Sequence, residues 1–234
     1  MGACHWPVLS SSPPSVRAMR GARAHTFQDD RNFRRQIMML IEQTPVPDAA
    51  LPVQEFKDHL RLGTGFADDG TQDVLLKRLL RAAMGAIEAR IGKVLIARDF
   101  LYTRSDWRDL AEQALPVAPV RWITSVTVLD RLGAGVLIAV SRYVLAKDLH
   151  RPKLVASGLL LPTIPTDGSV EIVFNAGFGV AWADVPVDLR QAVLLLGAHY
   201  HDVRSEAGVG MLPFGVTALI ERWRTIRVLG GGVA

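Results

Sequence analysis

The segment from Ser169 to Val203 constrains the fold of this chain more than any other part of the sequence. Apolar residues alternate along its first part, which predicts a strand over residues 169–174. Asn175-Ala176-Gly177 then interrupts the alternation and predicts a loop. Beyond Pro186, apolar residues return at helical spacing on most of the helix surface: Leu189, Ala192, Val193, Leu194, Leu195, Leu196, Ala198, Tyr200 and Val203. Such a helix, too short to span a bilayer, is expected inside a core or between subunits.

The start of this helix carries residues that favour a helix N-terminus. Asp184 is the predicted cap, and Pro186 suits the first turn. Asp188 places a negative charge near the positive end of the helix dipole. The sequence therefore predicts a helix over residues 186–204.

Two amphipathic helices are expected earlier in the chain, within residues 52–92. The first covers residues 52–62, and its apolar face consists of Val53, Phe56 and Leu60. The second covers residues 73–91, with Thr71 as its predicted cap and Gly92 as its predicted end. Its apolar stripe consists of Leu76, Leu79, Leu80, Ala83, Ile87 and Ile91.

Between residues 94 and 174 the apolar period changes to that of strands. The expected strands cover residues 94–103, 120–130, 136–145, 153–156 and 169–174. Leu132-Gly133-Ala134-Gly135 suits a hairpin turn, and no crossover helix fits the short connections, so antiparallel pairing is expected. After Met211-Leu212-Pro213-Phe214-Gly215, a last helix is expected over residues 216–228. The predicted fold class is α+β: a small helical bundle with an inserted antiparallel β-sheet and a C-terminal helical or extended arm.

Most of the positive charge lies in the N-terminal segment. Residues 1–38 hold six arginines against two aspartates, which accounts for the whole net charge of +4 and leaves the remainder neutral. This segment lacks apolar periodicity, which predicts disorder. Because Met38 and Met39 precede the first well-patterned segment, an alternative is that translation starts there. A basic DNA-binding arm is a third interpretation, and residues 39–234 are expected to form a single domain.

The sequence offers little support for catalysis, a cofactor or a metal. Cys4 is the single cysteine, so no intrachain disulfide or cysteine metal cluster can form. His199 and His201 are two positions apart on a predicted helix and therefore point in different directions. Gly177-Phe178-Gly179 follows a strand, but Trp182 stands where a dinucleotide-binding turn needs its third glycine. We therefore expect no catalytic, cofactor or metal site, and no membrane-spanning segment.

Several segments together resemble the head–tail connector (adaptor) proteins of tailed bacteriophages and gene transfer agents. Besides residues 169–203, they are Phe56-Lys57-Asp58-His59-Leu60-Arg61-Leu62, Ala89-Arg90-Ile91-Gly92-Lys93-Val94-Leu95, Pro119-Val120-Arg121-Trp122-Ile123-Thr124-Ser125-Val126, and Leu212-Pro213-Phe214-Gly215-Val216 with Trp223-Arg224. The resemblance covers roughly residues 53–229 and leaves residues 1–38 without a counterpart. Each motif is short, and their common order and spacing carry the resemblance.

The resemblance implies a non-enzymatic component of the head–tail junction of a virion or phage-like particle. Such adaptors form a dodecameric ring beneath the portal, extend the DNA channel without reading DNA sequence, and provide the platform for stopper or tail-completion proteins. In a closed ring each copy uses two different patches. The expected portal contacts are Leu212, Pro213, Phe214, Arg222, Trp223, Arg224 and Arg227. For Trp223 the alternative is packing on the core of its own subunit.

Two other classes of function stay open at this point. A small-molecule-binding α+β domain would have a closed apolar pocket under its sheet. A DNA-binding protein would use the basic N-terminal arm, although the neutral remainder argues against it.

Overall fold

The computed structural model describes residues 38–62, 70, 72–203 and 212–224, all within the compact unit Arg35–Ala234. The α-helices of this part are α1 (Val53–His59), α2 (Asp73–Ile91), α3 (Val187–Asp202) and α4 (Phe214–Ile220). Its strands are β1 (Met38–Glu42), β2 (Arg98–Arg104), β3 (Glu112–Ala114), β4 (Val120–Leu129), β5 (Gly135–Leu137), β6 (Tyr143–Ala146), β7 (Lys153–Ala156) and β8 (Ser169–Ala176). Its short 3-10 helices are η1 (Asp48–Ala50), η2 (Val140–Arg142), η3 (Trp182–Asp184) and η4 (Glu221–Trp223).

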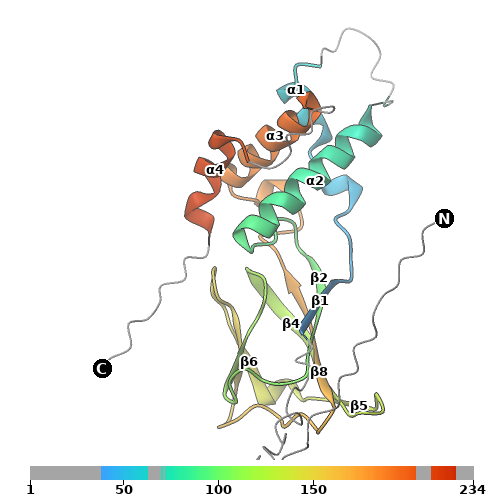
Figure 1. Ribbon diagram of the computed structural model, residues 1–234, viewed down its shortest axis with the longest axis vertical. Helices are drawn as coiled ribbons and strands as arrows, with labels where there is room; N and C mark the ends of the chain where they lie inside the picture. The colour runs from blue at the N-terminus through green and yellow to red at the C-terminus, as the bar shows by residue number, and fades with distance from the viewer. Residues whose placement is uncertain (1–37, 63–69, 71, 204–211, 225–234) are drawn as a thin grey trace, which may run out of the picture. The chain divides into compact units, whose positions relative to one another are not determined.

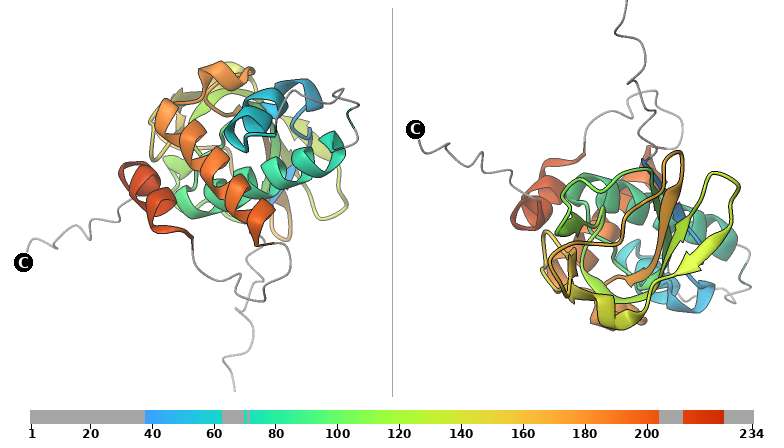
Figure 2. Two further views of the ribbon diagram at one scale, coloured as in Figure 1. Left: turned by 90° about the horizontal axis from the view of Figure 1, so that it is seen from above. Right: turned by 90° about the horizontal axis from the view of Figure 1, so that it is seen from below.

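The α-helices gather at one end of this unit and the strands at the other (Figure 1). The helices enclose one apolar cluster, the helical core, and α3 lies at its centre against α1, α2 and α4 (Figure 2). The Phe56 ring of α1 sits so close to Gly197 that a Cβ there would lie 3.0 Å from the ring. Residues buried in this core include Phe56, Leu76, Leu80, Ile87, Leu189, Val193, Leu196, Val216 and Ile220.

The nearly all-round apolar surface of α3 is thus covered largely by its own chain. Helices of the same chain pack on several sides of α3, and the buried residues include Leu189, Ala192, Val193, Leu194 and Leu196. The prediction of a core helix is confirmed. Packing between subunits is not needed to explain this apolar surface, because three helices of the same chain already cover most of it.

The strands form two antiparallel sheets rather than one inserted sheet. A five-stranded sheet has the order β1-β2-β8-β4-β5, and a three-stranded sheet has the order β3-β7-β6. A second apolar cluster, the sheet core, includes Phe100, Tyr102, Val126, Tyr143, Leu154, Ile172 and Phe174. The α+β class is confirmed, with helices and sheets each enclosing a core of their own.

Several predicted strand boundaries need correction. The strand expected over residues 136–145 is two strands of different sheets, because η2 turns the chain between β5 and β6. The strand expected from Val94 begins at Arg98, and β1 and β3 were not predicted. Met38, which we expected in the N-terminal extension, opens β1. The hairpin at residues 132–135 is confirmed by the antiparallel pairing of β4 with β5.

Helix α2 matches its predicted bounds, whereas the other helix ends differ. Gly92 ends α2 at φ +67°, the left-handed conformation that glycine adopts readily, and Thr71 lies outside the described residues. Helix α3 begins at Val187 with Pro186 at the cap position, so the predicted cap Asp184 is wrong. Asp184 closes η3 instead, where its carboxylate accepts a hydrogen bond from the Ala181 backbone N–H at 3.0 Å. The last helix, α4, begins at Phe214, earlier than predicted, and ends at Ile220, where η4 continues to Trp223. Arg224 is extended, so the prediction of an unbroken helix over residues 216–228 is wrong.

The connection from β8 to η3 joins the two cores. Ala176 is buried in the sheet core, and Phe178 packs on the helical core. The N–H of Gly177 donates to the Pro119 carbonyl at 2.9 Å, and that of Phe178 donates to the Leu95 carbonyl at 3.2 Å. The glycine turn is therefore a structural joint between sheet and helices.

Candidate functional site: the C-terminal arm

The surface that sequence reasoning selected is built on α4 and η4, and we call Leu212–Arg224 the arm. Pro213 takes the cap position of α4, and the Thr217 Oγ1 donates back to the Pro213 carbonyl at 3.3 Å. Val216 and Ile220 are buried in the helical core beside α3. The apolar side of this short helix therefore anchors the arm and sets which of its residues face outward.

The two aromatic residues of the arm have opposite environments. The Phe214 side chain is 88% exposed, whereas Trp223 is 8% exposed. The Trp223 ring meets the Phe178 ring edge-on, with the ring centroids 5.5 Å apart. Trp223 thus packs on the core of its own chain, and Phe214 is the aromatic group that a partner can reach. Leu212 and Pro213 are half-buried beside it.

The arginines of the arm already have partners within the chain. Arg222 lies 3.1 Å from the Asp188 carboxylate on α3, and its guanidinium stacks over Trp223 at 5.0 Å from the ring centroid. Arg224 lies 3.0 Å from the Glu221 carboxylate. Ion pairs this exposed contribute little to stability, so both arginines can exchange partners on binding. Arg227 lies outside the described residues.

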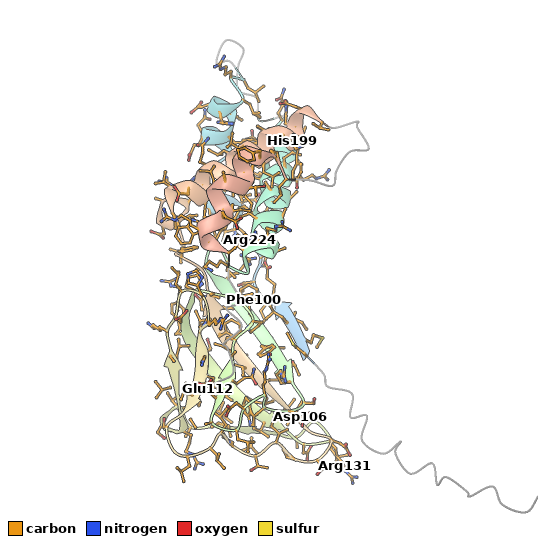
Figure 3. All side chains as sticks on the ribbon, turned by 60° about the vertical axis from the view of Figure 1, so that its left-hand side comes forward. Phe100, Asp106, Glu112, Arg131, His199 and Arg224 are labelled. Carbon is orange, nitrogen blue, oxygen red and sulfur yellow. The ribbon has the colours of Figure 1, made fainter. Side chains whose placement is uncertain are left out.

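A buried lysine fastens the arm to the sheets. Lys93, between α2 and β2, is 1% exposed, and its Nζ donates to the Trp223 carbonyl at 2.8 Å. The same Nζ lies 3.1 Å from the Nδ1 of His150, in the connection between β6 and β7. Lys93 therefore links three segments that are far apart in sequence. In Figure 3 the labelled Arg224, next to this link, lies where the helices meet the sheets.

The link predicts a specific pH dependence of stability. Burial lowers the pKa of the Lys93 ammonium, and the negative charge of Asp148 opposes that shift. A lysine with a lowered folded-state pKa costs stability while it is charged, and that cost disappears as the pH rises from its folded pKa to its ordinary 10.5. The unfolding free energy of the wild type, relative to Lys93→Met, should therefore rise between neutral and alkaline pH in urea titrations. A difference that stays constant with pH would contradict this account.

Sequence reasoning missed this link. Lys93 appears within one of the resembling segments, but nothing in its local pattern indicates burial. A lysine directly after the glycine that ends a helix is usually exposed. Its partners are a backbone carbonyl 130 positions away and the side chain of His150, and neither contact leaves a periodic signal.

Elsewhere in the described part of the chain, we find no arrangement of side chains that forms a metal site or a closed pocket. No three His, Cys, Asp or Glu side chains among the described residues are arranged to hold a metal ion. His199 and His201 both lie on α3, and His201 contacts Asp202 at 3.4 Å. The grooves found along the described residues are open to solvent, such as the one lined by η1, the start of α1 and Trp182. None of the described helices is long and apolar enough to cross a membrane.

Comparison with solved structures gives clear relatives. A chain of the neck of an empty GTA particle, in a structure with C6 symmetry, shares 53% identity at a TM-score of 0.76, covering 82% of this chain and 98% of that one. A chain of the virion of a native gene transfer agent (GTA) particle gives 53% identity and a TM-score of 0.74 at the same coverages. A chain of the neck of a native GTA particle, with C12 symmetry, gives 48% identity and a TM-score of 0.71, again over 82% and 98%. No family model and no curated protein matches the chain.

Proposed function

This chain belongs to the family of gene transfer agent neck proteins, and on that basis we propose that it is a head–tail adaptor that forms a ring beneath the portal. The observation that carries the proposal is the 53% identity with a neck chain, over 98% of that chain. Buried residues make up fewer than half of the described residues, so identity at this level must extend to exposed positions. Exposed positions are where subunits contact each other.

In this proposal the protein is a structural component, and twelve copies form the ring. The ring extends the DNA channel from the portal without recognising DNA sequence, and its other side receives the stopper or tail-completion protein. The C6 and C12 symmetries of the relatives' necks support a cyclic assembly. A subunit with two packed cores and open grooves suits such a role better than catalysis.

We further propose that the arm contacts the portal. Phe214 supplies an exposed aromatic anchor of the kind that dominates binding at protein interfaces. Arg222 and Arg224 lie on the same arm and can turn from Asp188 and Glu221 toward acidic groups of the portal. Trp223 is buried beneath this surface, and the hydrogen bond from Lys93 to the Trp223 carbonyl fixes the backbone of the arm at that point.

Replacement of Phe214 by serine is expected to weaken portal binding by at least about tenfold, because a buried aromatic anchor typically contributes about 2 kcal/mol. The measurement is binding of the purified variant to immobilised portal rings. Leu159→Ser is the matched control, because Leu159 is 91% exposed but lies in the connection between β7 and β8, away from the arm in sequence and on the strand-forming part of the chain. If Phe214→Ser bound the portal as well as the wild type does and Leu159→Ser lost binding, the arm would not be the portal contact, and the contact would lie on the strand-forming part of the chain.

The role itself is tested by removing the protein from a particle-producing cell. Without an adaptor, we expect DNA-filled heads and separate tails, and supplying the wild-type chain should restore joined particles. Joined, tailed particles in the complete absence of the chain would contradict the adaptor role. Electron microscopy of the purified particles distinguishes the two results.

A further inference from the structure

A ring requires two different contact surfaces on every copy. We infer that in this protein they are the two edges of the five-stranded sheet, with β5 of one copy pairing in parallel with β1 of the next. This inference rests on the proposed ring function and goes further, because it names the surfaces that join the copies.

The directions of the two edge strands fit a cyclic contact. Each neighbouring pair in the order β1-β2-β8-β4-β5 is antiparallel. An odd number of alternating strands leaves β1 and β5 running in the same direction. Rotation about an axis along the strands therefore places β5 of one copy parallel to β1 of the next. A two-fold contact would instead pair one edge with itself in antiparallel fashion.

The two edges also lie at the same height in the sheet. Following the register from strand to strand, Met39 is level with Thr103, then Glu171, then Thr127, and finally Leu137. A simple rotation thus brings Leu137 of one copy beside Met39 of the next without sliding along the strands. The same rule places Val136 beside Met38.

On β1 and β5, the backbone N–H and C=O groups that face away from the sheet belong to the residues that parallel pairing of the two edges requires. The Gln43 N–H donates to the Asp99 carbonyl, so Ile41 and Met39 face β2 while Leu40 and Met38 point away from it. Likewise the Ile138 N–H donates to the Val126 carbonyl, so Leu137 points away from β4. In a parallel pair, the Leu137 N–H would donate to the Met38 carbonyl, and the Leu40 N–H to the Leu137 carbonyl.

The side chains on both edges are apolar and exposed. Met38 is 63% exposed and Met39 46%, and across the sheet Val136 is 66% and Leu137 68% exposed. Edge strands that stay unpaired usually carry charges or proline. β5 has neither, and β1 has one charge, Glu42 at its end, whose carboxylate lies 3.0 Å from the Arg98 guanidinium of its own chain. Pairing would cover Leu137 with Met39 on one face of the sheet and Val136 with Met38 on the other. The occupant of each edge is therefore a second copy of this chain.

A disulfide between the two edges tests the inference in assembled particles. In a Cys4→Ser chain carrying Met39→Cys and Leu137→Cys, the paired Cα atoms would be about 4.8 Å apart, within disulfide range. After mild oxidation, gels without reductant should show a ladder extending beyond dimers toward the full ring. Either cysteine alone should give no cross-link, and Leu137→Cys with the exposed Val187→Cys on α3 is the matched control pair.

The outcomes separate this inference from the proposed function. Rings present at normal copy number without a ladder would overturn the edge contact and leave the adaptor role intact. Disulfide-linked dimers formed by a variant with only one of the two cysteines would instead indicate a two-fold contact, in which one edge pairs with itself. If the double variant does not assemble, particles containing a mixture of the two single variants should give dimers and nothing longer, and absence of those dimers also overturns it. Absence of the Cys4→Ser chain from particle necks would instead contradict the proposed function.

Discussion

Replacing Gly177 by alanine should lower the free energy of unfolding by about 4 kcal/mol, since a strained backbone and overpacking each cost about 1–3 kcal/mol. Gly177 has φ +141°, a conformation that residues with a side chain rarely adopt. A Cβ at this position would also lie 2.4 Å from the Ala97 Cα and 2.5 Å from its nitrogen. Because these neighbours are backbone atoms, they cannot turn aside as a side chain would.

Because Gly177 lies where the sheet core joins the helical core, the loss of stability is expected to affect both cores. The Gly179 carbonyl accepts a hydrogen bond from the Ala97 N–H at 2.7 Å, so the segment that follows β8 runs beside, and parallel to, the segment that leads into β2. Separating the two segments would loosen the joint between the sheet core and the helical core.

Urea titration of the purified chain measures the effect, and Gly85→Ala is the matched control. Gly85 lies on an exposed face of α2, and a Cβ there would have no atom within 4 Å. This control should stabilise the protein by roughly 0.5–1 kcal/mol, because glycine is unfavourable inside a helix. Equal unfolding free energies for the two variants would contradict the role assigned to Gly177.

Replacing Glu88 by alanine should cost about 3 kcal/mol, the lower end of the range for breaking a buried ion pair. Its carboxylate lies 2.6 Å from a guanidinium nitrogen of Arg98, which is 8% exposed. It also accepts the Leu95 N–H at 2.7 Å, so one carboxylate ties α2 to the chain entering β2. Burial acts to lower the pKa of Arg98, but the hydrogen bonds and charges of Glu88 and Glu42 raise it overall, so the guanidinium stays charged.

Two further variants isolate the contribution of the pair. Glu42→Ala should cost under about 1 kcal/mol, because Glu42 is 41% exposed and Glu88 would still hold Arg98. The double variant Glu88→Ala with Arg98→Met should recover part of the loss, since no uncompensated charge then remains buried. Thermal unfolding of the four proteins provides the test, and a double variant less stable than Glu88→Ala would refute the pairing argument.

Local sequence patterns predicted the elements that are long and periodic. The bounds of α2 were predicted because its apolar stripe and Gly92 are both local signals. The strand pattern at Val170, Ile172 and Phe174 was equally clear, because β8 lies inside a sheet and its alternate side chains are buried. The α+β class followed from these elements alone.

The remaining features depend on contacts that are distant in sequence. The strands β1 and β3 have five and three residues, too few to show a period, and they exist through pairing with β2 and β7. The arm could be selected from its resemblance, but the sequence could not decide that Trp223 points inward and Phe214 outward. That distinction comes from the packing of Phe178 on Trp223 and from the hydrogen bond of Lys93.

The adaptor role is tested most directly by co-expressing this chain with the portal protein of the same particle and measuring the mass of the purified complex. The account predicts a portal ring that carries a complete second ring of twelve copies, in keeping with the C12 symmetry of a related neck. Monomers in the absence of portal would agree with this, since docking can order a ring. A bare portal ring beside free monomers of this chain, at concentrations where both proteins are folded, would contradict it.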